Sequence, residues 1–217
     1  MSIAVISDVH ANIEALEAVL ADIQKRKIKR IAFLGDAVGY GPDPNEAIRI
    51  LKENCPVLLA GNHDWAAIGL TDIEYFNPNA KAAIIWTADG LSDESKTALR
   101  GFQLTVKMAE ENVFLVHSTP KDPEQWHYLL TYNDAIENLA FFTEQVCFVG
   151  HSHLPFILER TPSGEMQTRT GSAEINKGGR YVINAGSVGQ PRDRDPRACY
   201  AVFGEGRVEL VRVDYPF

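Results

Sequence analysis

Short apolar runs along the chain end abruptly in polar segments that carry aspartate, asparagine or histidine. The runs lie at residues 3–6, 31–34, 57–59, 113–116 and 146–149. Strands that are apolar at every position are expected where both faces of a sheet are covered. The pattern therefore predicts buried strands, each leading into a polar loop.

Helical patterns separate the first three of these strands. Residues 13–27 carry apolar side chains at helical spacing after Asn12, a candidate N-cap. The turn-rich segment 35–44 precedes a second helical stretch that runs to about residue 54. This βαβαβ alternation predicts a largely parallel sheet in the first part of the chain.

The rest of the chain predicts further helices and then mostly strands. Residues 63–101 are expected to form a helical, irregular insertion beside the site. Further elements are expected at 102–109 and 112–117 (a hairpin), 133–143 (a helix), 146–150 (a strand) and 156–213 (short alternating strands). Two packed sheets with helices outside follow from this order, and the absence of a linker in the sequence predicts one domain, 1–217.

Charge and composition argue against some broad classes of partner. The formal net charge of −8 at pH 7 disfavours bulk nucleic acid and anionic membranes. It leaves a phosphate substrate open, because bound divalent cations reverse the local sign of charge. No stretch approaches the roughly 20 apolar residues of a membrane span, and Cys55, Cys147 and Cys199 lack disulfide or zinc spacing. We expect a cytoplasmic protein; the sequence indicates no oligomeric state.

The polar segments after the strands carry candidate metal ligands and a candidate proton donor. They contain Asp8, His10, Asp36, Asn62, His63, His117, His151 and His153. Each motif alone is more often a turn or a satisfied polar group. Five of the six histidines nevertheless follow strands, and ligands of open α/β sheets gather at such strand ends. The sixth, His127, does not fit, and we expect it to have a surface or satisfied polar role.

The ordered motifs resemble the calcineurin-like metallophosphoesterase superfamily. The motifs are Asp8-x-His10, Gly35-Asp36, Gly61-Asn62-His63-Asp64, His117 and Gly150-His151-Ser152-His153. The stretches 8–12 and 184–192 are similar to those of its small bacterial and archaeal phosphoesterases. The resemblance implies an α/β fold of α+β type: a four-layer αββα sandwich with two mixed β-sheets flanked by helices.

The resemblance also implies a dinuclear metal centre. One metal would take Asp8, His10 and His153, the other would take Asn62, His117 and His151, and Asp36 would bridge them. Imidazole, carboxylate and amide ligands accept divalent transition metals such as Mn, Fe, Zn, Ni or Co. A metal-bridging hydroxide would attack the phosphorus, and His63 would be the general acid that protonates the leaving group.

Three positions depart from the serine/threonine protein phosphatases of this superfamily. Those enzymes have an Asp and an Arg where this chain has Gly39 and Tyr40, and a further Arg where it has Ala60. His63 therefore lacks an identified orienting partner, and a protein-phosphatase function is disfavoured. We expect Gly61 to permit a sharp turn. For Asp64 we expect a turn or cap at the start of the following helix, with support of a metal ligand as the less common alternative.

Candidate substrate-binding residues follow less directly from the sequence. Arg192 is expected to reach a substrate phosphate, although a turn that only closes the β-rich half is an equal alternative for its loop. Tyr40, Tyr75, Phe76 and Trp86 are candidates for stacking on a nucleobase, with core packing the commoner role of such residues.

Three functions remain open at this stage. The first is hydrolysis of small phosphodiesters or phosphoanhydrides, with a small phosphate-containing substrate such as a nucleotide. The second is hydrolysis of dinucleoside polyphosphates such as diadenosine tetraphosphate. The third is a non-catalytic metal-binding scaffold, like a retromer coat subunit of the superfamily, which the presence of His63 disfavours.

Overall fold

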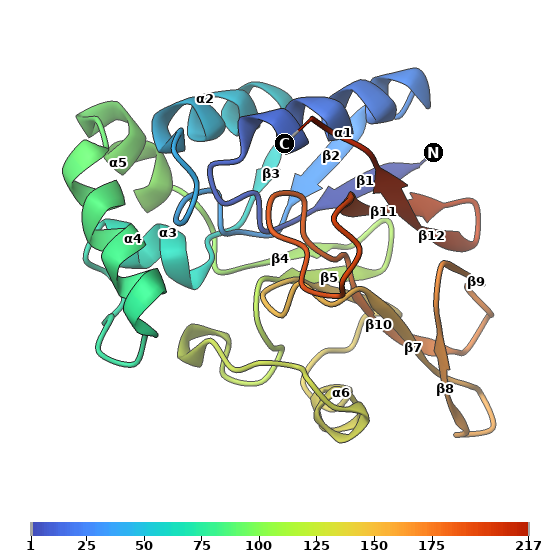
Figure 1. Cartoon of the computed structure of the whole chain (residues 1–217). Helices are drawn as coiled ribbons and strands as arrows, with labels where there is room; N and C mark the ends of the chain where they lie inside the picture. Colours follow the sequence, from blue (N-terminus) through green and yellow to red (C-terminus); the bar gives the residue numbers. More distant parts are fainter. Residues whose placement is uncertain (1, 217) are drawn as a thin grey trace.

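A computed structural model describes residues 2–216 and arranges their strands in two six-stranded sheets (Figure 1). The first has the order β3-β2-β1-β11-β12-β9 and the second the order β4-β5-β6-β10-β7-β8. The strands are β1 (Ile3–Ile6), β2 (Arg30–Phe33), β3 (Val57–Leu58), β4 (Thr105–Met108), β5 (Val113–Val116), β6 (Val146–Val149), β7 (Phe156–Arg160), β8 (Met166–Arg169), β9 (Ser172–Glu174), β10 (Arg180–Asn184), β11 (Ala198–Gly204) and β12 (Arg207–Val213). The helices are α1 (Ile13–Lys25), α2 (Pro44–Asn54), α3 (Asn62–Ala67), α4 (Pro78–Gly90), α5 (Asp93–Arg100), α6 (Tyr132–Asn138) and a short 3-10 turn, Pro123–Gln125.

The two sheets pack face to face between outer helices. Helices α1 and α2 cover the outer face of the first sheet, and α6 covers that of the second (Figure 1). Three apolar clusters fill the three interlayer spaces. In β1, Ala4 and Ile6 point toward the helices while Ile3 and Val5 point toward the second sheet. This alternation explains why the strand is apolar throughout, and the four-layer prediction is confirmed.

Chain order does not separate the two sheets. Strands β1, β2 and β3 are parallel, but β11 returns antiparallel beside β1, and β12 and β9 extend the same sheet. The second sheet is also mixed, with β5, β6 and β10 parallel. The C-terminal β-rich part therefore contributes to both sheets.

Some element ends differ from the sequence expectation. Helix α1 stops at Lys25 rather than residue 27, because Lys27 takes a φ of 59° and the amide of Ile28 donates back to the Ile23 carbonyl. That left-handed residue closes the helix. Helix α6 ends at Asn138, several residues before the expected end at 143.

The segment 63–101 forms most of three helices at one end of the sandwich (Figure 1). The side chains of Asn77 and Ser92 cap α4 and α5. Helix α3 begins at Asn62, so Asn62 and His63 lie in its first turn. No helix in the described range 2–216 is long and apolar enough to cross a membrane.

Candidate metal centre

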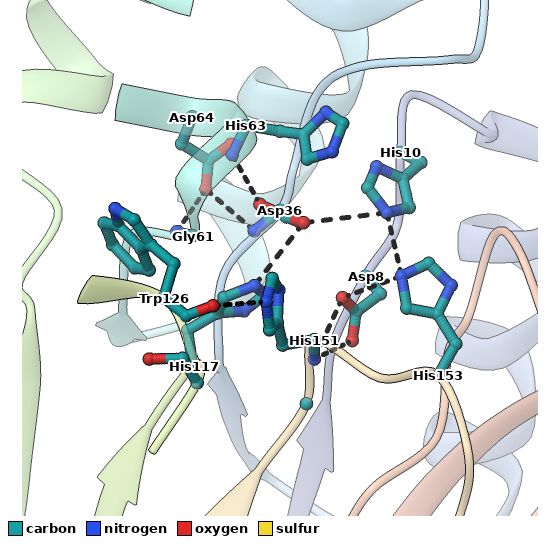
Figure 2. Close-up of polar contacts among 12 residues, drawn as sticks. Asp8, His10, Asp36, Gly61, His63, Asp64, His117, Trp126, His151 and His153 are labelled. Carbon is teal, nitrogen blue, oxygen red and sulfur yellow. Dashed lines mark hydrogen bonds and ion pairs between the residues drawn. The ribbon is translucent and has the colours of Figure 1, made fainter. Parts of the chain in front are cut away.

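Seven buried side chains converge where the strands end. They are Asp8, His10, Asp36, Asn62, His117, His151 and His153. They come from the loops after β1, β2, β5 and β6 and from the first turn of α3, which follows β3. Figure 2 shows the carboxylate of Asp36 between His10 and the pair His117 and His151. Segments far apart in sequence thus meet at one edge of the sandwich.

Two groups of potential metal ligands share Asp36. One contains Asp8, His10, Asp36 and His153, and the other contains Asp36, His117 and His151. Within each group, one ligand atom per residue lies within 4.8 Å of all the others. Oδ2 of Asp36 lies 3.7 Å from Nε2 of His10 and 3.4 Å from Nε2 of His117. One carboxylate oxygen therefore faces both groups.

The second ring nitrogen of three histidines is held by a backbone carbonyl. Nδ1 of His10 lies 3.0 Å from the Val38 oxygen, and Nδ1 of His153 lies 2.6 Å from the Gln190 oxygen. Nε2 of His151 lies 2.9 Å from the Trp126 oxygen. Such contacts fix ring orientation and tautomer in metal sites, and each leaves the opposite nitrogen facing the centre.

The backbone is held in left-handed conformations at five of these positions. Asp8, His10, Asp36, His151 and His153 have φ between 49° and 63°. Residues other than glycine adopt such φ values uncommonly, and strained positions cluster at functional sites. Here the strain turns each side chain inward after its strand.

Asn62 and His117 supply a direct test of whether a cation fits. Oδ1 of Asn62 and both ring nitrogens of His117 are buried and make no hydrogen bond in the structure. Burying polar atoms without partners is costly. Oδ1 of Asn62 and one ring nitrogen of neutral His117 have a lone pair available to a metal ion, so the residues present fit a bound cation.

The carboxylates and histidines perturb one another strongly. Burial raises the pKa of Asp8, but the charge and hydrogen bond of His153 together with the charge of His117 outweigh it and hold that pKa below its usual range. Burial lowers the pKa of His117, yet the Asp36 carboxylate raises it to about 9. Burial, aided by His117, lowers the pKa of His151 to about 3. The carboxylates of Asp36, Asp8 and Asp64 together therefore outweigh the effect of burial on the pKa of His117.

Asp64 holds together the loops that carry Asp36 and Asn62. As expected for a cap, its carboxylate accepts a hydrogen bond from the Gly61 amide at the start of α3. It also accepts from the amides of Asp36, Ala37 and Val38 at 2.8, 2.9 and 3.2 Å. The cap prediction was correct for α3 but missed these bonds, which position the loop that presents Asp36.

Gly61 is needed for a close approach and not for a turn. Its φ of −102° is open to any residue, so the change of direction between β3 and α3 does not itself require glycine. A Cβ at this position would lie 2.1 Å from Oδ1 of Asp36 and 2.6 Å from the Asp36 amide. Glycine therefore allows the two ligand-bearing loops to touch.

His63 lies next to the ligands and is oriented by its backbone and by other rings. Its amide donates to Oδ1 of Asp36 at 2.9 Å. The ring centroid lies 4.9 Å from those of His10 and Tyr40 and 5.1 Å from that of Phe76. Nδ1 is buried without a hydrogen-bond partner. The orienting partner that the sequence left unidentified is therefore replaced by aromatic rings that pack against His63.

The loop 184–192 forms a platform under the ligands. Ser187 Oγ and the Gly189 amide donate to the Asp8 carbonyl at 2.8 and 2.9 Å. The Gln190 carbonyl contacts His153, as described above. Arg192 is exposed and donates to the Gln190 side chain at 3.2 and 2.7 Å. The loop does more than close the β-rich half.

The structure sorts the remaining candidates. Tyr40, Tyr75 and Phe76 line a pocket beside His63, whereas Trp86 is 55% exposed on α4 and does not line it. His127 is exposed, as expected for a surface role. Trp126 and Tyr128, for which the sequence leaves the same choice between base stacking and core packing, line the pocket beside His63 as well. Sequence reasoning missed only the contact of the Trp126 carbonyl with His151, since every residue has a backbone carbonyl.

Comparison with known proteins agrees with this geometry. Residues 1–205 match a family described as the calcineurin-like phosphoesterase superfamily domain. An uncharacterized protein of Methanocaldococcus jannaschii is 40% identical over 98% of this chain and 87% of its own length. The crystal structure of a metallophosphoesterase from Sphaerobacter thermophilus is 39% identical, with a TM-score of 0.85 over 100% of this chain and 89% of that one. A hypothetical protein from Pyrococcus horikoshii OT3 has the same fold, with 21% identity and a TM-score of 0.77 over 99% of this chain and 88% of that one. The chain belongs to the calcineurin-like phosphoesterase superfamily.

Proposed function

We propose that this protein is a dinuclear metal-dependent phosphoesterase that hydrolyses small phosphodiesters. The observation that carries the proposal is the pair of ligand groups sharing Asp36. A single-metal site needs no second set of inward-facing, buried ligands. The family supports a hydrolase of small phosphate-containing substrates with divalent metal ions.

The residues of each group would hold one cation. Asp8, His10 and His153 would bind the first, and Asn62, His117 and His151 the second, with Asp36 in contact with both. Two divalent cations, when bound, supply Lewis acidity to a phosphoryl oxygen and lower the pKa of a water molecule that attacks phosphorus. Mn, Fe, Co, Ni and Zn all suit the nitrogen and oxygen donors.

The protein's own contribution to bond breaking is assigned to His63. Its ring lies in contact with the His10 ring and also lines the pocket beside the centre. From there the imidazole can protonate the oxygen that leaves phosphorus, a role typically worth about 10²- to 10⁴-fold in rate. The bond from the His63 amide to Asp36 ties the proton donor to the carboxylate shared by both metal sites.

Asp64 and the platform loop would keep the ligands in place before any metal binds. The hydrogen bonds that four backbone amides donate to the Asp64 carboxylate fix the loops of Asp36 and Asn62. Carbonyls of Val38, Gln190 and Trp126 fix three imidazoles. Pre-oriented ligands lower the ordering cost of metal binding and of catalysis.

Arg192 is proposed to contact the substrate phosphate at the rim of the centre. Its charge acts on two residues of the pocket: it contributes to lowering the pKa of His63, for which burial is the larger cause. It also opposes the burial that raises the pKa of Tyr128. A guanidinium in this region suits a phosphate oxygen that faces solvent.

The direct test is hydrolysis of bis(p-nitrophenyl) phosphate by metal-free protein and by protein reloaded with Mn²⁺, Fe²⁺, Co²⁺, Ni²⁺ or Zn²⁺. We expect turnover only after reloading, and we expect His117→Ala to abolish it. His127→Ala is the matched control, because His127 is an exposed histidine outside the centre. Inert protein with all five metals would overturn the proposal and favour a non-catalytic scaffold.

A further inference from the structure

Two open pockets flank the centre, and the ring of Tyr40 borders both. The first, here called the aromatic lobe, has a volume of about 330 Å³ and lies on the side of Asn62, His63 and His151. The second has a volume of about 610 Å³ and lies on the side of His10, next to Gly189 and Tyr215. A phosphodiester held at the centre thus has room for a substituent on each side.

Aromatic rings dominate the lining of the aromatic lobe. Tyr40, Tyr75, Phe76, Trp126 and Tyr128 all contribute to it. Tyr75 is 93% exposed at its rim, and the Trp126 indole is anchored by a hydrogen bond to Thr71 at 3.2 Å. Volumes of about 300 Å³ and above accommodate small organic ligands, and planar bases stack on such rings.

The charge of the lobe is unsuited to a phosphate chain. Among the described residues that line it, Asp72 is the only one with a formal charge at neutral pH besides any charge on its histidines, and neither lysine nor arginine lines it. Arg192, whose charge reaches His63 and Tyr128, stands outside this lining and would supply a single positive charge. A dinucleoside polyphosphate would place a multiply charged nucleotide in the lobe as leaving group. Cationic side chains would be needed there to compensate that charge.

The position of His63 assigns the lobe to the leaving group. The proton donor must lie within reach of the oxygen that departs from phosphorus. Since His63 lines the aromatic lobe and not the second pocket, the departing group lies in the aromatic lobe. An alkoxide needs this proton more than a phosphate leaving group does, because it is the stronger base.

We infer that the aromatic lobe binds the base of an uncharged nucleoside, which leaves from a nucleotide phosphodiester. The bond between phosphorus and the nucleoside oxygen breaks with its electron pair on that oxygen, which takes a proton from His63. Water supplies the hydroxyl that remains on phosphorus, so the products are a phosphomonoester and a free nucleoside. This inference rests on the proposed phosphoesterase function and separates it from dinucleoside polyphosphate hydrolysis.

Product analysis with adenosine 5′-(methyl phosphate) tests the inference on the metal-reloaded protein. Both possible leaving groups are simple alkoxides, so chemistry alone gives little preference between them. Stacking worth about 1–3 kcal/mol per base predicts adenosine plus methyl phosphate over AMP plus methanol by about 5- to 150-fold. Predominance of AMP plus methanol would overturn the assignment of the lobe.

Two variants connect the product ratio to the lobe. Tyr75→Ala is expected to lower the ratio of adenosine to AMP several-fold. Because the Tyr75 side chain is exposed, its removal should leave the fold intact. Trp86→Ala is the matched control, since Trp86 is an exposed aromatic outside the lobe. An unchanged ratio in Tyr75→Ala, or an equal fall in Trp86→Ala, counts against the inference.

Two further substrates separate the possible failures. Diadenosine tetraphosphate should be hydrolysed with a lower kcat/KM than the dinucleoside monophosphate ApA, and the reverse order would overturn the inference. Turnover of bis(p-nitrophenyl) phosphate without turnover of either adenosine diester would reject the nucleoside and leave the phosphoesterase function standing. Inertness toward every ester would reject the function itself.

Discussion

A Cβ atom on Gly39 would lie 2.4 Å from Nδ1 of His63. Gly39 also has a φ of +89°, which side chains disfavour. The protein therefore leaves no space for a carboxylate at the position that carries one in the serine/threonine phosphatases. Tyr40 and Phe76 pack on the His63 ring instead, with centroid distances of 4.9 and 5.1 Å.

Gly39→Ala should displace the His63 ring and impair proton donation. We expect kcat for alkyl phosphodiesters to fall by about 10²-fold or more, with a smaller loss for p-nitrophenyl esters. Gly69→Ala is the matched control: Gly69 also has a positive φ, 76°, but has open space around its Cβ position. If both variants lose activity equally, backbone strain and not contact with His63 is responsible.

His63→Ala should keep the metals and lose turnover in a way that depends on the leaving group. An alkoxide requires protonation as it departs, whereas p-nitrophenolate leaves readily without it. Kinetics across a series of phosphodiesters should therefore show a steeper dependence on leaving-group basicity than in the wild type. Equal losses across the series would remove His63 from the acid role.

Asp64→Asn should weaken both folding and metal binding, because an amide presents one acceptor oxygen and a donor group to four backbone amides. Loss of bonds to a buried carboxylate predicts a decrease of about 1–3 kcal/mol in the free energy of unfolding of the metal-free protein. Urea denaturation and metal analysis after dialysis measure the two effects.

Asp134→Asn provides the comparison for Asp64→Asn. Asp134 also caps a helix, α6, by accepting from the amides of Leu130 and Thr131, but it is only half-buried and is not among the ligand groups. We expect a loss of about 0.5–1 kcal/mol with normal metal content. Full metal retention in Asp64→Asn would contradict its role in presenting Asp36.

Asp36→Asn should lose metal and activity together. Oδ2 of Asp36 faces both ligand groups, and an amide in that place carries no negative charge to hold two cations. The expected result is less than one metal ion per chain after dialysis and no measurable diester hydrolysis. Normal metal content with full turnover would remove Asp36 from the shared position.

The sequence predicted the layers, and it singled out side chains that the structure brings together at one edge of the sandwich. The pattern of apolar strands followed by polar loops identified Asp36 and His117, because the residue type alone shows that a side chain at a strand end can bind a metal. The contacts of Asp64 with Ala37 and of Trp126 with His151 are different, since they use backbone amides and carbonyls that every residue possesses. The residue types therefore do not predict such pairs, whose members are 25 or more positions apart in the sequence.

Packing around His63 was equally beyond sequence reasoning. Phe76 and Trp86 both lie in the segment 63–101, and the sequence gives no reason to expect one rather than the other next to His63. The loop between α3 and α4 brings the Phe76 ring onto His63, while Trp86 on α4 remains exposed. Only the path of the chain distinguishes them.

The central claim is that two cations share Asp36 at one catalytic centre. The most direct test is a titration of metal-free protein with Mn²⁺. Bound metal per chain and bis(p-nitrophenyl) phosphate hydrolysis are both measured in every sample. The account predicts saturation at two ions per chain, with full activity reached only as the second site fills. Saturation of both signals at one ion per chain would contradict it.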